Sequence, residues 1–178
     1  GIGGQVQIYH FHDWCGEQLR AYHVNRPAFG DGYVDRLVDT VIAASGKGDI
    51  PKGQYGAVMI DEGHDFQPEW LQLVVEMVDP ETNSLLLLYD DAQSIYSKKK
   101  QLDFSLSSVG IQARGRTTVL KLNYRNTDEI LTFAYRFAMN YLKAEDKDED
   151  HVPLIEPHSA GRHGPRPAVK LLENYEQE

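Results

Sequence analysis

Two short apolar runs, each followed at once by acidic residues, constrain the fold of this chain most. Residues 57–60 read Ala-Val-Met-Ile before Asp61 and Glu62, and residues 85–89 are four leucines and a tyrosine before two aspartates. Continuous apolar runs of this length are typical of strands covered on both faces, as in parallel sheets. Between them, a helix with a regular apolar face is predicted from Pro68 onward. The order strand, helix, strand predicts an α/β fold with a mostly parallel sheet.

The rest of the chain supplies further elements around this unit. A helix is predicted at residues 12–23, which have no glycine or proline after Gly16, and apolar spacing predicts another at 33–44. A further helix is predicted at 127–142, capped by Asn126 or Thr127. Strands are predicted at residues 5–9, 117–122 and 168–172, and loops at 45–56 and 158–167. Because ligands bind beyond the carboxyl ends of parallel strands, we expect the functional residues to come directly after residues 60 and 89, where the two apolar runs end.

Composition limits the classes of function. The chain has 178 residues and a formal net charge of -9, so any contact with nucleic acid must come from local groups. The single cysteine, Cys15, excludes an internal disulfide and fits a reducing, cytoplasmic setting. No apolar run approaches the ~18 residues of a membrane span, so we expect no membrane partner. The sequence starts at Gly1 without methionine, and we expect a processed or excised piece of a longer protein.

The adjacent acids after the first apolar run suit metal-assisted hydrolysis. Two neighbouring carboxylates repel each other unless a cation offsets their charge, and Mg²⁺ carrying nucleotide phosphates would do so. Asp61 would hold a water of that ion, and Glu62 would orient and deprotonate the attacking water. The same residues also suit an ordinary turn with solvated acids and Asp65 at the start of a helix.

The second apolar run leads into a glutamine and a tyrosine. Gln93 can donate to a phosphate oxygen and accept from a water at once, so it could sense a terminal phosphate. Tyr96 offers an aromatic face on which a base could stack. A simple turn followed by a buried tyrosine is the alternative interpretation.

Three strings occur in order along the chain: VMIDEGHDF, LLLLYDDAQSIY and VLKLNYRNTDEIL. They resemble motifs II, III and IV of UvrD-like superfamily 1 DNA helicases, whose forms approximate DExQD, GDxxQSIY and LxxNYRS. The earlier string IYHFHDWC resembles the family's Thr-Phe-His motif before a helix. The resemblance spans roughly residues 10–142 and is far stronger as a set than in any single motif.

The resemblance implies a fold and a set of partners. The fold would be RecA-like, as in P-loop NTPases, with residues 1–112 forming the later part of a first motor domain. Residues 113–178 would begin the second motor domain. The intact parent would couple hydrolysis of ATP, bound with Mg²⁺, to movement on single-stranded DNA and to duplex unwinding.

The resemblance also assigns roles by position. Asp61 would be the magnesium-associated acid and Glu62 the catalytic base. Gln93 would contact the terminal phosphate, and Arg125 would reach that phosphate across a cleft, where its permanent, forked charge suits the task.

The same resemblance implies a contact surface for DNA. Phe11 and His12 would lie along the track of the single strand, and Tyr96 would lie near it.

Some residues depart from the family pattern. His64 stands where glutamine is common, so its coupling role is open, and Tyr89 replaces a usual glycine. Three lysines at residues 98–100 replace a stretch that often carries an aromatic residue. They offer phosphate contacts, or they belong to a solvated loop.

The phosphate-binding loop G-x-x-x-x-G-K-[ST] does not occur in the sequence. The nearest string, at residues 45–48, lacks the first glycine and the final hydroxyl. A nucleotide site needs this cradle, so we expect no ATP hydrolysis by this chain alone.

Two alternatives come from other functional classes. His10, His12 and Asp13 have a spacing that can ligate one metal, and Asp61, Glu62 and His64 could add ligands, as in a metal-dependent hydrolase. The chain could also be an ATPase-derived interaction module that is catalytically inert.

Overall fold

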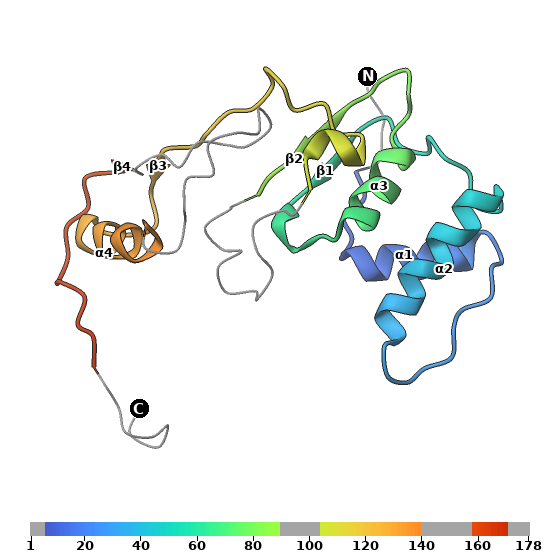
Figure 1. Ribbon diagram of the computed structural model, residues 1–178, viewed down its shortest axis with the longest axis horizontal. Helices are drawn as coiled ribbons and strands as arrows, with labels where there is room; N and C mark the ends of the chain where they lie inside the picture. Colours follow the sequence, from blue (N-terminus) through green and yellow to red (C-terminus); the bar gives the residue numbers. More distant parts are fainter. Residues whose placement is uncertain (1–5, 90–103, 140–157, 171–178) are drawn as a thin grey trace. The chain divides into compact units, whose positions relative to one another are not determined.

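The computed structural model describes residues 6–89, 104–139 and 158–170, which are coloured in Figure 1. The chain divides into two compact units, Gly1–Tyr89 and Asp90–Glu178. Each contains helices and one short two-stranded parallel sheet, so the α/β class is confirmed. The boundary expected after residue 112 separates two motor domains rather than two compact units, and it stays a prediction.

The first unit holds most of the regular structure. Its elements are α1 (Phe11–Ala21), α2 (Tyr33–Lys47), β1 (Val58–Ile60), the 3-10 turn η1 (Gly63–Asp65), α3 (Pro68–Met77) and β2 (Leu85–Leu87). The helices predicted at residues 12–23 and 33–44 are confirmed. Helix α2 extends three residues past its expected end at residue 44. It ends at Gly48, which has a left-handed backbone and whose N–H donates to the carbonyl of Ser45 at 3.1 Å.

Helices α1 and α2 lie side by side and enclose the main core (Figure 1). Leu19 of α1 and Val38 and Val41 of α2 are fully buried. Helix α3 adds Leu73 and Met77 to the same cluster. Apolar residues spaced three and four apart on each helix produce this shared face, as the sequence pattern predicts.

A hydrogen-bonded network of polar side chains fastens α1 to the loop before β1. The hydroxyl of Tyr55 accepts from the indole of Trp14 at 2.8 Å and from the amide of Gln18 at 3.1 Å. The amide of Gln54 in turn donates to Gln18 at 3.0 Å. Because Trp14 and Gln18 are buried, these bonds satisfy donors that water cannot reach.

Strands β1 and β2 pair in parallel, with Val58 opposite Leu85 and Ile60 opposite Leu87. Pro68 occupies the first turn of the connecting helix α3. The strand–helix–strand unit predicted from the two apolar runs is therefore confirmed. Its strands are shorter than the runs themselves.

The expectation that both faces of this sheet are covered is wrong for the described residues. Ile60 is 5% exposed, whereas the adjacent Met59 is 73% exposed and its register partner Leu86 is 46% exposed. Successive side chains of a strand point to opposite faces. The elements that the structure describes thus cover the Ile60 face and leave the Met59 face open.

The strand expected at residues 5–9 is also wrong over its described part. Residues 6–9 form no strand, and Val6 and Ile8 are 89% and 90% exposed. Alternating side chains make a strand only where a neighbouring strand accepts its backbone hydrogen bonds, and no described segment does so here.

The second unit has a small set of elements: η3 (Leu106–Val109), β3 (Leu122–Asn123), α4 (Asp128–Met139) and β4 (His158–Ser159). The predicted helix at residues 127–142 is confirmed as far as the described residues go, and its amide at Ile130 bonds Thr127 Oγ1 at 3.4 Å. Of the strand expected at 117–122, only Leu122 pairs: together with Asn123 it forms β3, which pairs with β4 in a segment expected to be loop. Residues 168–170 form no strand.

The segment after β4 is fastened to the start of α4. The carboxylate of Glu129 accepts from the backbone N–H of Gly164 at 2.9 Å and lies 3.2 Å from Nδ1 of His163. The backbone N–H of Glu129 itself and then that of Gly164 lower the pKa of this carboxyl to about 2. The sequence pattern shows nothing of this contact, because its partners are over thirty residues apart.

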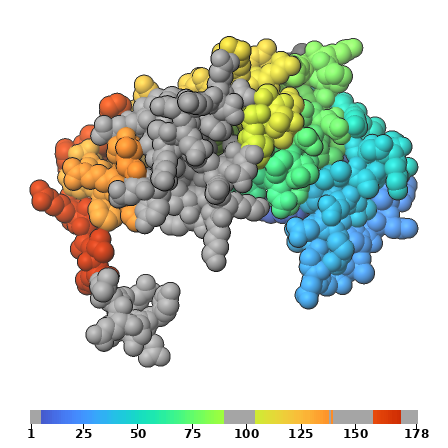
Figure 2. Space-filling model, in the orientation of Figure 1, coloured from blue at the N-terminus to red at the C-terminus, as the bar shows by residue number. Residues whose placement is uncertain are grey.

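Within the ranges that the structure describes, shown as coloured atoms in Figure 2, no helix has the length and apolar character needed to cross a bilayer.

Candidate functional site

The predicted acids follow β1 directly, at the edge where both strands of the first sheet end. The carbonyl of Ile60 accepts from Leu88 N–H at 2.9 Å, and Gly63 N–H then donates to the carbonyl of Leu88 at 2.8 Å. The chain therefore turns at residues 61–62, and the residues on either side of this turn, Ile60 and Gly63, are both hydrogen-bonded to Leu88 at the end of β2. Asp61 and Glu62 are both exposed there, at the edge where the sheet rule places ligands.

Glu62 has a left-handed backbone, with φ 52° and ψ 44°. This conformation costs a residue other than glycine roughly 1–2 kcal/mol, and it persists only where the surroundings enforce it. The carbonyl of Glu62 accepts from Asp65 N–H at 2.9 Å, and the carboxylate of Asp61 accepts from Glu62 N–H at 3.1 Å. The turn thus fixes the direction in which the Glu62 side chain leaves the backbone.

His64 lies beneath the acids. Its side chain is 7% exposed, and its Nε2 lies 3.6 Å from Glu62 Oε2 and 3.8 Å from Asp65 Oδ1. These separations are longer than direct hydrogen bonds. The residue that departs from the family pattern therefore lies against the predicted base and a second acid.

The residues predicted to line a DNA track, Phe11 and His12, form part of an aromatic cluster. The ring of Phe11 lies 4.8 Å from that of Phe66 and 5.2 Å from that of Trp70. His12 meets Trp70 edge to face at 5.1 Å. All four side chains are half-buried, so part of each ring surface is occupied by its neighbours.

His12 is in a partly dehydrated environment. Burial, and then the neighbouring His10, lower the pKa of His12 below its ordinary value. Its Nε2 is buried and has no hydrogen-bond partner in the described part of the chain. The neutral imidazole is therefore favoured at this position, which suits stacking better than binding a phosphate.

Sequence reasoning missed Phe66 and Trp70 as members of this cluster. Trp70 falls within the helix predicted from Pro68 onward, and Phe66 is the last residue of the string VMIDEGHDF. Phe66 and Gln67 have extended backbones before α3 begins at Pro68, so no helical spacing relates Phe66 to Trp70 and the sequence carried no signal for their contact. Their contact with Phe11 needed the tertiary structure.

The proposed metal ligands fall into two groups, one around His10 and His12 and one at Asp61. Within residues 6–89, 104–139 and 158–170, no three His, Cys, Asp or Glu side chains are grouped to hold a metal ion. His10, His12 and Asp13 thus form no ready-made metal site. Asp61 suits a different case, because Mg²⁺ needs only one or two carboxylates and keeps its waters and phosphates as other ligands. An exposed carboxylate at a strand end fits that requirement.

Arg125 belongs to the second unit, in the turn between β3 and α4. The side chain of Asn123 accepts from the backbone N–H groups of Arg125 at 3.0 Å and Asn126 at 2.9 Å, which shapes this turn. Arg125 is exposed, so its guanidinium is accessible to a ligand. Its approach to a phosphate near Glu62 stays a prediction.

Gln93, Tyr96 and the lysines at 98–100 lie outside the described residues, so their predicted roles rest on the sequence alone.

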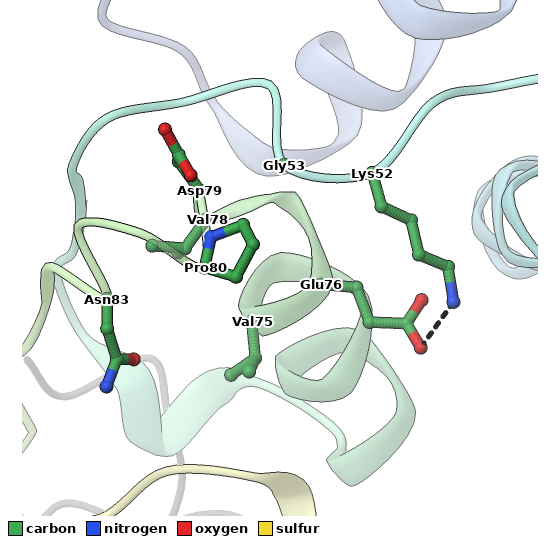
Figure 3. Close-up of a pocket in the computed structure, with 8 residues that line it drawn as sticks. All are labelled: Lys52, Gly53, Val75, Glu76, Val78, Asp79, Pro80 and Asn83. Carbon is green, nitrogen blue, oxygen red and sulfur yellow. Dashed lines mark ion pairs between the residues drawn. The ribbon is translucent and has the colours of Figure 1, made fainter.

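The pocket drawn in Figure 3 lies at the opposite end of the first sheet, between residues 52–53, the end of α3 and the turn before β2. Val75, Val78 and Pro80 give it an apolar lining, and the Lys52 ammonium is paired with Glu76 at 2.9 Å. A triphosphate needs unpaired cations or backbone N–H groups. This pocket therefore does not suit the predicted nucleotide.

Comparisons with known proteins identify no family. No family model, curated protein or solved structure matches this chain.

Proposed function

We propose that this chain is the central part of a UvrD-like superfamily 1 DNA helicase. The observation that carries the proposal is the turn at Asp61 and Glu62, which presents two exposed acids at the carboxyl edge of a parallel strand pair. The left-handed Glu62, anchored by the hydrogen bond from Gly63 to Leu88, is a strained conformation of the kind found at active sites.

In this proposal the fold is RecA-like, and the parent protein works in the cytoplasm on ATP and single-stranded DNA. Asp61 holds a water of the magnesium ion, which neutralises phosphate charge when bound. Glu62 orients the attacking water and takes its proton. His64, 3.6 Å away, helps to orient the Glu62 carboxylate.

The remaining roles come from the motifs. Gln93 contacts the terminal phosphate, and Arg125 supplies a permanent positive charge to it. Phe11, His12 and Tyr96 lie along the DNA. The phosphate-binding loop comes from polypeptide outside this sequence, so the chain by itself binds ATP weakly and does not hydrolyse it.

The test compares the isolated chain with the whole protein encoded by its gene. We expect the whole protein to hydrolyse ATP faster with single-stranded DNA, and Glu62→Gln to reduce that rate by about 10²–10⁴-fold, as for loss of a general base. Glu69→Gln, an exposed acid of α3, is the matched control and should retain the rate. A whole protein without DNA-dependent turnover contradicts the proposal. ATP turnover by the isolated chain that disappears in Glu62→Gln contradicts the need for a separate phosphate loop.

A further inference from the structure

Phe66 lies between the two parts of the proposed site. On one side its ring contacts Phe11, which the proposal places on the DNA track, with ring centres 4.8 Å apart. Trp70 flanks both rings, at 5.2 Å from Phe11 and 6.2 Å from Phe66. On the other side, Phe66 ends the turn that begins at Glu62.

The backbone between Glu62 and Phe66 is a single stiff turn. Asp65 N–H donates to the carbonyl of Glu62 at 2.9 Å, and Phe66 N–H donates to the carbonyl of Gly63 at 3.2 Å. The turn is fixed to the sheet through Gly63, whose N–H bonds Leu88 at 2.8 Å. The backbone of Phe66 is therefore hydrogen-bonded into the same turn that carries Glu62.

We propose that Phe66 is a positioning residue that transmits the occupancy of Phe11 by a DNA base to the carboxylate of Glu62. This inference rests on the proposed function. A base that stacks on Phe11 changes the space open to the Phe66 ring, whose centre lies 4.8 Å from that of Phe11, and in this proposal the change passes to the turn through the backbone of Phe66. Because Glu62 is already strained, a small movement of the turn changes the direction of its carboxylate.

The competing explanation is that Phe66 only packs α1 against α3. A packing role would alter stability and DNA binding together, whereas a positioning role alters the response of the turn to DNA. The experiment therefore measures that response in the whole protein. Hydrogen exchange of the backbone N–H groups of residues 62–66 is followed with and without oligothymidylate, together with the ratio of ATP turnover with DNA to turnover without it.

The variants separate the two explanations. Phe66→Leu keeps an apolar side chain but loses the ring. We expect it to lose the DNA-induced change in exchange and to lower the turnover ratio by about tenfold, a typical allosteric coupling. Phe66→Tyr keeps the ring and should restore both. Phe29→Leu removes an 85% exposed ring outside the cluster and should leave both readouts as in the wild type.

Each outcome is decisive. Wild-type exchange at residues 62–66 that does not respond to saturating DNA overturns the positioning role. A Phe66→Leu variant with an unchanged response overturns it as well, and leaves the helicase proposal standing. Absence of any DNA-stimulated turnover in the wild type overturns both proposals.

Discussion

The backbone N–H of Gly63 donates a 2.8 Å hydrogen bond to the carbonyl of Leu88, which brings the turn after β1 against the end of β2. A side chain at Gly63 would require the Leu87 side chain to move. A Cβ there would overlap Cδ1 of Leu87 and lie 3.2 Å from its Cγ. This contact fixes the acids of the candidate site to the sheet.

We expect Gly63→Ala to lower the free energy of unfolding by about 1–3 kcal/mol, the usual cost of overpacking. Urea denaturation followed by tryptophan fluorescence measures it. Gly46→Ala is the control, since that glycine lies in α2 with nothing within 4 Å of an added Cβ. It should raise stability by about 0.5–1 kcal/mol, because alanine favours a helix. Equal stability of the two variants would show that Gly63 has more room than the contact indicates.

The hydroxyl of Tyr55 predicts a second effect on stability. Tyr55→Phe leaves the buried donors of Trp14 and Gln18 without their acceptor, and we expect a loss of about 1–3 kcal/mol. Tyr22→Phe removes one long hydrogen bond, 3.3 Å to Gln54, and should cost less than about 1 kcal/mol. Thermal unfolding of the two variants compares them directly. A harmless Tyr55→Phe would mean that water reaches both donors.

Because one face of the first sheet is open, we expect Met59 in β1 to tolerate a charged side chain. Met59→Lys should change the free energy of unfolding by no more than about 0.5 kcal/mol, as expected of a surface position. Its neighbour Ile60 is 5% exposed, and Ile60→Lys should cost at least about 3 kcal/mol, because it buries a charge and removes packing. Chemical denaturation of the two proteins tests this contrast. A large loss in Met59→Lys would show that another part of the protein covers this face.

The contact between Glu129 and residues 163–164 predicts a dependence on acid. The pKa of Glu129 lies at about 2 in the folded chain against an ordinary value of 4.5, so folding favours the charged form. The stabilisation is complete above pH 4.5 and is lost as pH falls toward about 2. An NMR titration should show the amide resonance of Gly164 shifting with a midpoint near 2. In Glu129→Gln this transition should vanish, and a midpoint near 4.5 in the wild type would refute the contact.

Sequence patterns predicted the helices better than the strands. Helices α1, α2, α3 and α4 all appear within a few residues of their expected positions, because apolar spacing and end signals such as Pro68 act locally. Strands depend on a partner. Residues 6–9 alternate correctly yet pair with nothing described, and residues 158–159 pair although their composition indicated a loop.

For the candidate site, the chain order alone placed Asp61 and Glu62 at a strand end, since an apolar run followed by acids is a local signal. It did not reveal the left-handed backbone of Glu62, the burial of His64 or the contact of Phe66 with Phe11. Each of these depends on atoms brought together from distant segments, such as Leu88 against Gly63.

The sequence by itself determined which segments are helical, where the two apolar strands run and which acids follow them, because backbone propensity and apolar periodicity act over a few residues. Only the tertiary structure decided which face of the sheet is covered and which rings meet near the acids. Those outcomes depend on side-chain packing between remote segments, which no local pattern specifies.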